Sequence, residues 1–266
     1  MLVTRATIRV ATLLLTGATT TLGAQTAPPR RPFHAELSGF YNRLDGPYGA
    51  WRGVDVRLQY ATPRLTPMLF ASTQTRREGT QQSYGVGSYV VFNRWVYAIV
   101  GASGAPAGSA ILYPRLRLDA SALANVPGVP GLVATAGITE IDFDGDGGGR
   151  IWSVGSLYYR GRVIVTDVLR FNRDRVSGAG SMSGLVGAQY GAQGDYWLGA
   201  SVGGGTEAYQ VLAATPFDVR FRSVGGSAFL QKWLRPAAGL TVRYEYEHKL
   251  TAYHRHGVSS GIFVDF

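Results

Sequence analysis

The chain alternates apolar and polar residues in segments of about ten residues that are separated by turn residues. The clearest of these segments are residues 54–60, 115–122 and 240–247. Successive side chains of a β-strand point to opposite faces, so each segment predicts a strand with one apolar and one polar face. Strands of this length and period are typical of transmembrane β-barrels.

Counting the segments from His34 to Phe266 predicts about fourteen strands, or twelve if two weak segments are loops. Tight turns at 93–94, 161–162 and 191–195 fall on one parity along the chain. The wider connections fall on the other parity, at 105–111, 144–150, 174–180, 206–216 and 248–255. Short periplasmic turns alternate with longer extracellular loops in bacterial barrels. The pattern therefore predicts an all-β fold, an antiparallel transmembrane β-barrel in the bacterial outer membrane.

One segment, residues 163–171, does not have a clean polar face. Asp167 and Arg170 fall on opposite faces of this strand, since they are three residues apart. We therefore expect one of the two side chains to lie near an interface or a rim of the barrel.

The two ends of the chain agree with export to the outer membrane. Residues 1–24 combine Arg5 and Arg9 with a short apolar stretch and a small-residue cleavage site, which predicts a secretory signal. Residues 25–33 are then a periplasmic lead-in, and residues 34–266 form a single barrel domain. At the other end, Ser259, Gly261, Val264 and Phe266 together resemble the C-terminal signal that the barrel-assembly machinery recognises.

Composition narrows the class of protein further. The chain contains no cysteine, which excludes disulfides and thiolate metal sites, and no apolar run after residue 25 reaches the length of a transmembrane helix. The 36 glycines and 15 tyrosines suit a sheet with one apolar and one wet face. We expect two interfacial girdles from the aromatic residues near strand ends: Trp51, Trp95, Tyr97, Trp152, Tyr158, Tyr159, Tyr196, Trp197, Trp233, Tyr244 and Tyr246. A soluble β-sandwich, which would bury these rings, is the alternative.

The formal net charge is +9, and it falls to +7 when Arg5 and Arg9 leave with the signal. The arginines are spread over nearly every strand rather than gathered in a stripe, which argues against a nucleic acid partner. On the alternation above, the residues expected to point into the lumen are Arg57, Arg115, Arg117, Asp119, Arg243, Glu245 and Glu247. A basic lumen would favour anionic solutes or polymers, although paired carboxylates would cancel much of that preference.

Several motifs in the second part of the chain point to a known family. The stretches Leu112–Arg117, Ala134–Gly137, Tyr158–Gly161 and Tyr196–Glu207 resemble the YaiO-type outer-membrane barrel proteins. This resemblance covers roughly the C-terminal two-thirds of the mature chain. It implies an integral barrel that accompanies surface-polysaccharide or envelope systems, and it implies no functional residue.

The histidines are the first place to look for catalysis. His248, His254 and His256 cluster around the last extracellular connection, and His254 and His256 share one face of a strand. A lipid or peptide hydrolase centred on this region is the alternative to a non-enzymatic barrel, although no nucleophile signature accompanies the histidines.

Two glycine-rich motifs carry weaker signals. Residues 142–147 begin like a calcium-binding loop, but the twelfth position is Ser153 rather than Glu, so an extracellular turn is the expected structure. Residues 203–206 lack the helix of a phosphate loop and are read as a bend or a close packing point. We therefore expect no metal site and no cofactor.

The sequence favours a non-enzymatic pore, or an accessory protein, for passage of an anionic or glycan polymer. The expected partners are outer-membrane lipid and lipopolysaccharide, the barrel-assembly machinery and an anionic polysaccharide. A structural or adhesive barrel that binds a partner through the loop at 206–216 is a further alternative.

Overall fold

The computed structural model describes residues 31–106, 113–145, 147–207, 221–250 and 252–266. The strands are β1 (Phe33–Leu44), β2 (Ala50–Tyr60), β3 (Leu65–Arg76), β4 (Gly79–Val91), β5 (Val96–Gly104), β6 (Leu116–Asn125), β7 (Leu132–Asp142), β8 (Gly148–Arg160), β9 (Val163–Asp174), β10 (Gly180–Ala192), β11 (Tyr196–Glu207), β12 (Phe221–Arg235), β13 (Ala238–Lys249) and β14 (Tyr253–Asp265). A short 3-10 turn, Gly46–Tyr48, follows β1. Among these residues, no helix has the length and apolar character needed to cross a bilayer.

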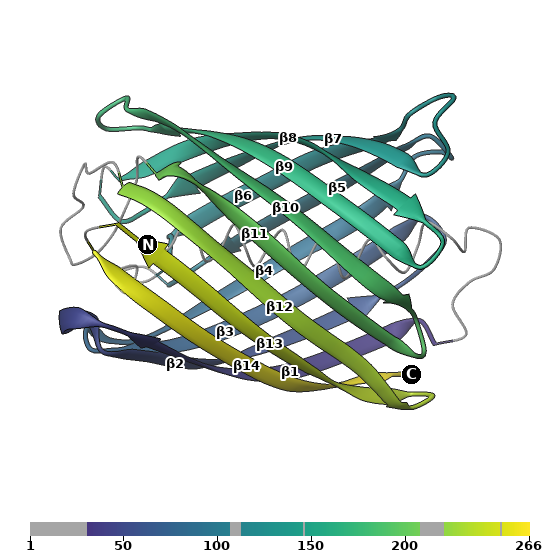
Figure 1. Ribbon diagram of the computed structural model, residues 1–266, viewed down its shortest axis with the longest axis horizontal. Coiled ribbons are helices and arrows are strands. Elements are labelled where there is room, and N and C mark those ends of the chain that lie inside the picture. Colours follow the sequence, from purple (N-terminus) through teal and green to yellow (C-terminus); the bar gives the residue numbers. More distant parts are fainter. Residues whose placement is uncertain (1–30, 107–112, 146, 208–220, 251) are drawn as a thin grey trace.

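The strands form one closed antiparallel barrel in which each strand pairs with its neighbours in the chain and β14 pairs with β1 (Figure 1). Closure leaves no strand edge, so every strand has a partner for its backbone on both sides. The predicted fold class and the count of about fourteen strands are confirmed.

The closing seam joins the two ends of the barrel domain. The backbone amides and carbonyls of Phe33 and Phe266 exchange two hydrogen bonds of 2.9 Å, and their rings stack with centroids 5.3 Å apart. We call the end of the barrel that holds Phe33 and Phe266 the periplasmic end. The wider connections, such as residues 175–179, lie at the opposite, extracellular end, which is the parity that the sequence pattern predicted.

Alternation along each strand separates an outer face from a lumen face. Most of the large apolar side chains that remain exposed lie on the outer face of the strands, with Ile262 at 62 % and Val202 at 61 % exposure. Such a continuous apolar surface would be a liability in water, and it is the surface that a barrel presents to lipid.

Inward phenylalanines lie against inward glycines of the neighbouring strand. Phe263 pairs with Gly239 across β14 and β13, and a Cβ on Gly239 would come within 2.3 Å of the Phe263 ring. Phe70 and Gly85 repeat the arrangement across β3 and β4, where a Cβ on Gly85 would lie 2.1 Å from the Phe70 ring. An aromatic ring that covers a strand glycine shields the bare backbone and fixes the local register.

A periplasmic turn carries the clearest exposed ion pair. Asp195 follows β10 and lies 3.1 Å from the Lys232 ammonium and 2.9 Å from the Arg162 guanidinium. Hydrogen bonds from Lys232 and then from Arg162 lower the pKa of the Asp195 carboxyl below its ordinary value of 3.8.

The segment with the ambiguous pattern, residues 163–171, divides cleanly between the two faces of β9. Arg170 points into the lumen and is buried, while Asp167 is exposed on the outer face. The Asp167 carboxylate accepts a hydrogen bond from the Ser156 hydroxyl on β8. Along β9 the outward neighbours of Asp167 are Val165 and Leu169, so this carboxylate lies within the apolar band rather than at a rim.

Candidate functional site

The lumen side chains form three layers along the barrel axis. Aromatic and aliphatic residues line the periplasmic end, hydroxyl groups and ion pairs line the middle, and charged residues fill much of the extracellular end. Because inward positions recur every second residue, each strand contributes one or two side chains to each layer.

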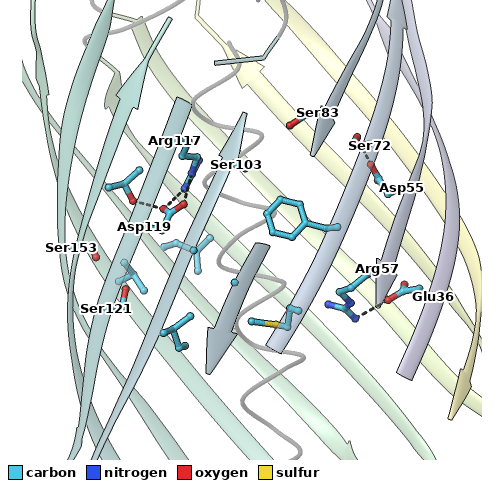
Figure 2. Close-up of a pocket in the computed structure, with 18 of the residues that line it drawn as sticks. Glu36, Asp55, Arg57, Ser72, Ser83, Ser103, Arg117, Asp119, Ser121 and Ser153 are labelled. Atoms are coloured by element: carbon cyan, nitrogen blue, oxygen red, sulfur yellow. Dashed lines mark hydrogen bonds and ion pairs between the residues drawn. The ribbon is translucent and has the colours of Figure 1, made fainter. Parts of the chain in front are cut away.

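The middle layer surrounds a cavity of about 400 Å³ (Figure 2). Its wall carries small hydroxyl side chains from strands around most of the barrel: Ser38, Ser72, Ser83, Ser103, Ser121, Ser153, Thr166, Thr241 and Ser259. The rings of Phe70, Phe229 and Tyr113 also line it. A wall of this kind combines hydrogen-bonding groups with a few flat apolar surfaces.

Two hydrogen-bonded ion pairs lie in this wall, and Arg243 and Glu245, 3.9 Å apart, also line it. The Arg117 guanidinium donates two hydrogen bonds of 2.7 Å to the Asp119 carboxylate, which also accepts one of 2.6 Å from the Thr139 hydroxyl. On the opposite side in Figure 2, Arg57 donates to the Glu36 carboxylate at 2.7 Å. A bidentate arginine–carboxylate pair is the geometry that best compensates two charges for losing water.

Another carboxylate in the wall, that of Asp55, is held by a hydroxyl group. The Ser72 hydroxyl donates to Asp55 at 2.5 Å, and its oxygen lies 2.8 Å from the phenol oxygen of Tyr113. Tyr113 comes from the segment before β6, so this contact ties an extracellular connection to the lumen wall.

The extracellular layer includes a buried cluster of charges on β13 and β14. Arg255 lies 3.0 Å from Glu247 and 4.0 Å from Glu245, and Lys249 lies 3.9 Å from Glu247. The side chains of Lys249 and Arg255 are 0 % and 2 % exposed. Arg243 completes the set at 3.9 Å from Glu245. Charges this deeply buried are tolerated because each has an opposite charge beside it.

The periplasmic layer is a belt of inward apolar side chains on most strands from β4 to β14. Its members are Tyr89, Tyr97, Ile99, Leu123, Val133, Leu157, Ile164, Trp197, Trp233 and Phe263. At the seam the belt gives way to polar groups, where Asp265 accepts hydrogen bonds from the Trp233 indole at 2.9 Å and pairs with the His34 imidazole at 2.7 Å.

Six of the seven lumen candidates from the sequence lie on the inward face: Arg57, Arg117, Asp119, Arg243, Glu245 and Glu247. Arg115 was placed wrongly. It precedes β6 at the extracellular rim, its side chain is 56 % exposed, and it forms an ion pair with Asp142. Arg115 has the same sequence parity as the inward residues Arg117 and Asp119. However, β6 begins only at Leu116, so the alternation of the strand does not fix the direction of the Arg115 side chain.

The predicted aromatic girdles were wrong for the residues that face the lumen: Trp51, Tyr97, Tyr159, Trp197 and Trp233. The outward aromatic residues include Trp95, Trp152, Tyr158 and Tyr244, together with Phe33, Tyr41, Tyr60, Tyr84, Phe92, Phe171, Tyr190 and Phe266. Position near a strand end does not decide the face, because neighbours such as Tyr158 and Tyr159 point in opposite directions.

The described residues of the histidine region are not grouped as a hydrolase site would require. His254 and His256 share one face, as predicted, but that face is the outer one. Ser259, Glu245 and Glu247 lie on the lumen face of the same two strands, on the other side of the barrel wall. The barrel wall therefore separates these three residues from the histidines. Ser260 shares the outer face but follows His256 by four residues along β14, a distance of about 13 Å.

The calcium-like loop after β7 uses its carboxylates differently. Asp142 pairs with Arg115 and, at 2.8 Å, with Arg175. Within the described part of the chain, no three His, Cys, Asp or Glu side chains are grouped so as to hold a metal ion. In the glycine run, a Cβ on Gly205 would lie 2.4 Å from the Met182 carbonyl oxygen, consistent with close packing.

The C-terminal signal residues are divided between the two faces of β14. Ser259 and Gly261 point inward, while Val264 and Phe266 point outward. Recognition by the assembly machinery stays a prediction. The predicted signal peptide and most of the lead-in, up to residue 30, lie outside the described residues, as does residue 208 onward of the loop at 206–216.

Sequence reasoning missed three features of the structure. The ring of lumen hydroxyls escaped notice because serine and threonine are common on any polar strand face. The His34–Asp265 pair joins residues 231 positions apart, and only the closing register brings them together. The outward Asp167–Ser156 pair was signalled in part by the broken alternation of β9.

The chain has a fold similar to those of solved outer-membrane β-barrels. Its fold is similar to a bacterial polysaccharide outer membrane secretin, with a TM-score of 0.59, 7 % identity, and coverage of 90 % of this chain and 99 % of that one. It is also similar to the outer membrane protein Omp33 of Acinetobacter baumannii, with a TM-score of 0.53, 11 % identity, and coverage of 88 % and 98 %. At these identities the likeness concerns the fold alone. No curated protein matches the sequence.

The family model for the YaiO membrane beta barrel domain matches residues 33–210. The match begins at β1, well before the motifs that suggested the resemblance, and it ends before the last three strands. It nevertheless covers more than half of the chain. The chain is an outer-membrane β-barrel protein and belongs to the YaiO family.

Proposed function

We propose that this protein is a non-enzymatic component of polysaccharide passage across the outer membrane, and that its lumen holds a segment of glycan. The observation that carries the proposal is the cavity of about 400 Å³ with a wall of serine and threonine hydroxyls. Sugar hydroxyls both donate and accept hydrogen bonds, and the hydroxyl groups of the wall do the same.

Aromatic surfaces in the wall support the same ligand class. Phe70, Phe229 and Tyr113 offer flat faces beside the hydroxyls. Ligand sites commonly combine such apolar faces with a small number of polar groups that fix orientation. The C–H faces of a pyranose ring can pack on the aromatic rings, and its hydroxyl groups can form hydrogen bonds with the serine and threonine hydroxyls.

The charges of the wall favour a neutral or sparsely charged glycan over a polyanion. The wall carries four arginines and four carboxylates, so its formal charge is balanced: Arg57, Arg117, Arg170, Arg243, Glu36, Asp55, Asp119 and Glu245. Arg57 and Arg117 each have a carboxylate at 2.7 Å. We therefore propose a neutral or sparsely charged glycan in place of the anionic polymer that the sequence led us to expect. The fold likeness to a protein described as a polysaccharide outer membrane secretin supports the proposal only as an analogy.

A pair of substitutions that differ only in which face they alter tests the proposal. Ser121 lies in the cavity wall, and Ala120 precedes it on the outer face of β6. We expect Ser121→Trp to fill part of the cavity and to reduce the uptake of neutral oligosaccharides into proteoliposomes severalfold. Ala120→Trp adds the same ring to the lipid side and should leave uptake unchanged.

Both variants must show the heat-modifiable gel mobility of a folded barrel, so that a loss of uptake is not a loss of folding. Equal uptake by Ser121→Trp and the parent protein would contradict passage through this lumen. So would an equal loss in both variants.

A further inference from the structure

The outer face of the seam strands carries a group of cationic and aromatic side chains at the extracellular end. We call it the seam rim, and it consists of Arg43 on β1, Arg52 on β2, Tyr244, Tyr246 and His248 on β13, and His254 and His256 on β14. Below it, the outer faces of the same strands are almost entirely apolar, with residues such as Val54, Val242 and Ile262.

The strand register brings the members of the seam rim together. Tyr246 is directly opposite His256, and His256 is directly opposite Arg43 across the β14–β1 closure. Directly opposed residues of antiparallel strands have Cβ atoms about 5 Å apart. Arg52 is opposite Tyr41 and therefore lies diagonal to Arg43.

Hydrogen bonds to tyrosines orient the imidazoles. The Tyr244 phenol oxygen lies 2.7 Å from Nδ1 of His256, and the Tyr246 phenol oxygen lies 3.0 Å from Nδ1 of His254. A phenol that donates to Nδ1 leaves the proton of the neutral imidazole on Nε2. Each ring can then donate from Nε2 to a group outside the barrel, and protonation adds a positive charge without removing that donor.

The seam rim has no carboxylate of its own. Among the described outward residues of β13, β14, β1 and β2 there is no Asp or Glu. The nearest acidic group is Asp45 in the connection after β1, and it accepts a hydrogen bond of 2.5 Å from the backbone amide of His254. The guanidinium groups of Arg43 and Arg52 are diagonal neighbours on this face, so both are positioned for an anion from outside the chain.

On the opposite wall of the barrel, two neighbouring outward arginines have a carboxylate of the same chain beside them. Arg150 and Arg173 are directly opposed on the outer faces of β8 and β9. There Glu140 accepts two hydrogen bonds from Arg150, at 2.6 and 2.8 Å. The seam rim lacks a counterpart to Glu140.

We propose that the seam rim binds the phosphorylated sugar headgroup of a glycolipid in the outer leaflet. The site faces outward at the level where the apolar band ends on the extracellular side, which is the level of lipid headgroups. Arginine guanidinium groups form strong paired hydrogen bonds with phosphate, and clusters of basic residues at a membrane surface recognise anionic lipids. The aromatic rings of Tyr244 and Tyr246 supply amphipathic surfaces beside the phosphate donors.

This site lies on the outer face and is independent of the proposed role of the lumen. Its test uses the refolded mature barrel in detergent, titrated with bisphosphorylated lipid A and followed by native mass spectrometry. We expect the triple variant R43Q/R52Q/H256Q to bind lipid A at least about tenfold more weakly than the parent protein, because several charge-assisted hydrogen bonds are lost.

Two matched controls decide the result. The variant R150Q/R173Q removes two arginines from the same level of the opposite wall and should bind lipid A like the parent. Lipid A with its phosphates removed should bind the parent protein as weakly as bisphosphorylated lipid A binds the triple variant. Inorganic phosphate should not displace bound lipid A, since the seam rim also needs the apolar band to hold the acyl chains.

Equal binding of lipid A by the triple variant and the parent protein would overturn the proposal, provided that both show folded gel mobility. So would equal binding of the phosphorylated and dephosphorylated lipids. Displacement by inorganic phosphate would show a free-anion site instead and would also contradict a lipid site.

Discussion

The lumen face and the outer face of the seam strands, β13, β14, β1 and β2, treat charge in opposite ways. Inside, Arg57 pairs with Glu36, and Arg255 pairs with Glu247. Outside, the seam rim gathers arginines and histidines, and no Asp or Glu is among the described outward residues of these strands. A confined lumen cannot supply mobile counterions as freely as bulk water, so its charges are matched within the chain.

This difference shows where the excess positive charge of the protein is located. Residues 25–266 carry a formal charge of +7, and the lumen ion pairs cancel rather than concentrate it. Much of the excess lies on rims and turns, as at Arg43, Arg52 and Arg173. A basic composition therefore indicates a partner at the membrane surface at least as much as an anionic cargo inside the barrel.

The largest effect should come from breaking a lumen pair. Arg117→Met leaves the Asp119 carboxylate in the wall with only the Thr139 hydroxyl beside it, and we expect unfolding to become easier by about 3 kcal/mol. Arg52→Met, on the seam rim, should change the free energy of unfolding by no more than about 0.5 kcal/mol. Reversible urea unfolding in lipid vesicles, followed by tryptophan fluorescence, measures both values.

Similar small losses in the two variants would remove the contrast between the faces. A double variant, Arg117→Met with Asp119→Leu, sharpens it. The double variant should recover much of the stability that the single variant loses, because the unpaired carboxylate is then gone.

A smaller effect concerns Asp167, whose carboxylate lies in the middle of the apolar band. Asp167→Leu should stabilise the barrel by about 1–2 kcal/mol, because it replaces an ionisable side chain facing lipid with an apolar one. Ser156→Ala is the informative companion, since it removes the hydroxyl that donates to Asp167 and should destabilise. The same unfolding measurement applies, and a loss of stability in Asp167→Leu would show that Asp167 has another partner.

The smallest effect lies at the exposed turn, where water screens charges. Lys232 and Arg162 hold the pKa of Asp195 below 3.8, so the contribution of this ion pair to stability is present above that pH and is lost as the pH falls through the lowered pKa. Asp195→Asn should therefore lower the melting temperature slightly at neutral pH and not at all in strong acid. A difference from the parent protein that grew on acidification would contradict this assignment.

The fold could be read from the sequence because alternation with period two and the spacing of turns are local properties. In segments such as residues 54–60 and 240–247, the alternation itself shows which side chains face lipid and which face the lumen, whatever the partner strand is. The count of about fourteen strands, the position of Phe33 and Phe266 at one end of the barrel and the direction of Arg57 and Arg117 followed from that pattern.

The candidate sites were harder to predict because they depend on register between strands distant in sequence. Arg43 and His256 are neighbours only through the β14–β1 closure, and nothing local to either residue indicates it. The aromatic residues show the same limit, since Trp197 and Trp233 meet in the lumen belt although their surroundings in the sequence suit a girdle.

The central claim is that a charge-balanced, hydroxyl-lined lumen admits glycan. Single-channel recording of the refolded mature protein in a planar bilayer tests it most directly, with ion selectivity taken from the reversal potential in a salt gradient and neutral oligosaccharide added to one side. We predict steady current steps with weak ion selectivity that neutral oligosaccharide interrupts. Strong anion selectivity without interruption by sugar, or silence from a barrel shown to be folded, would contradict it.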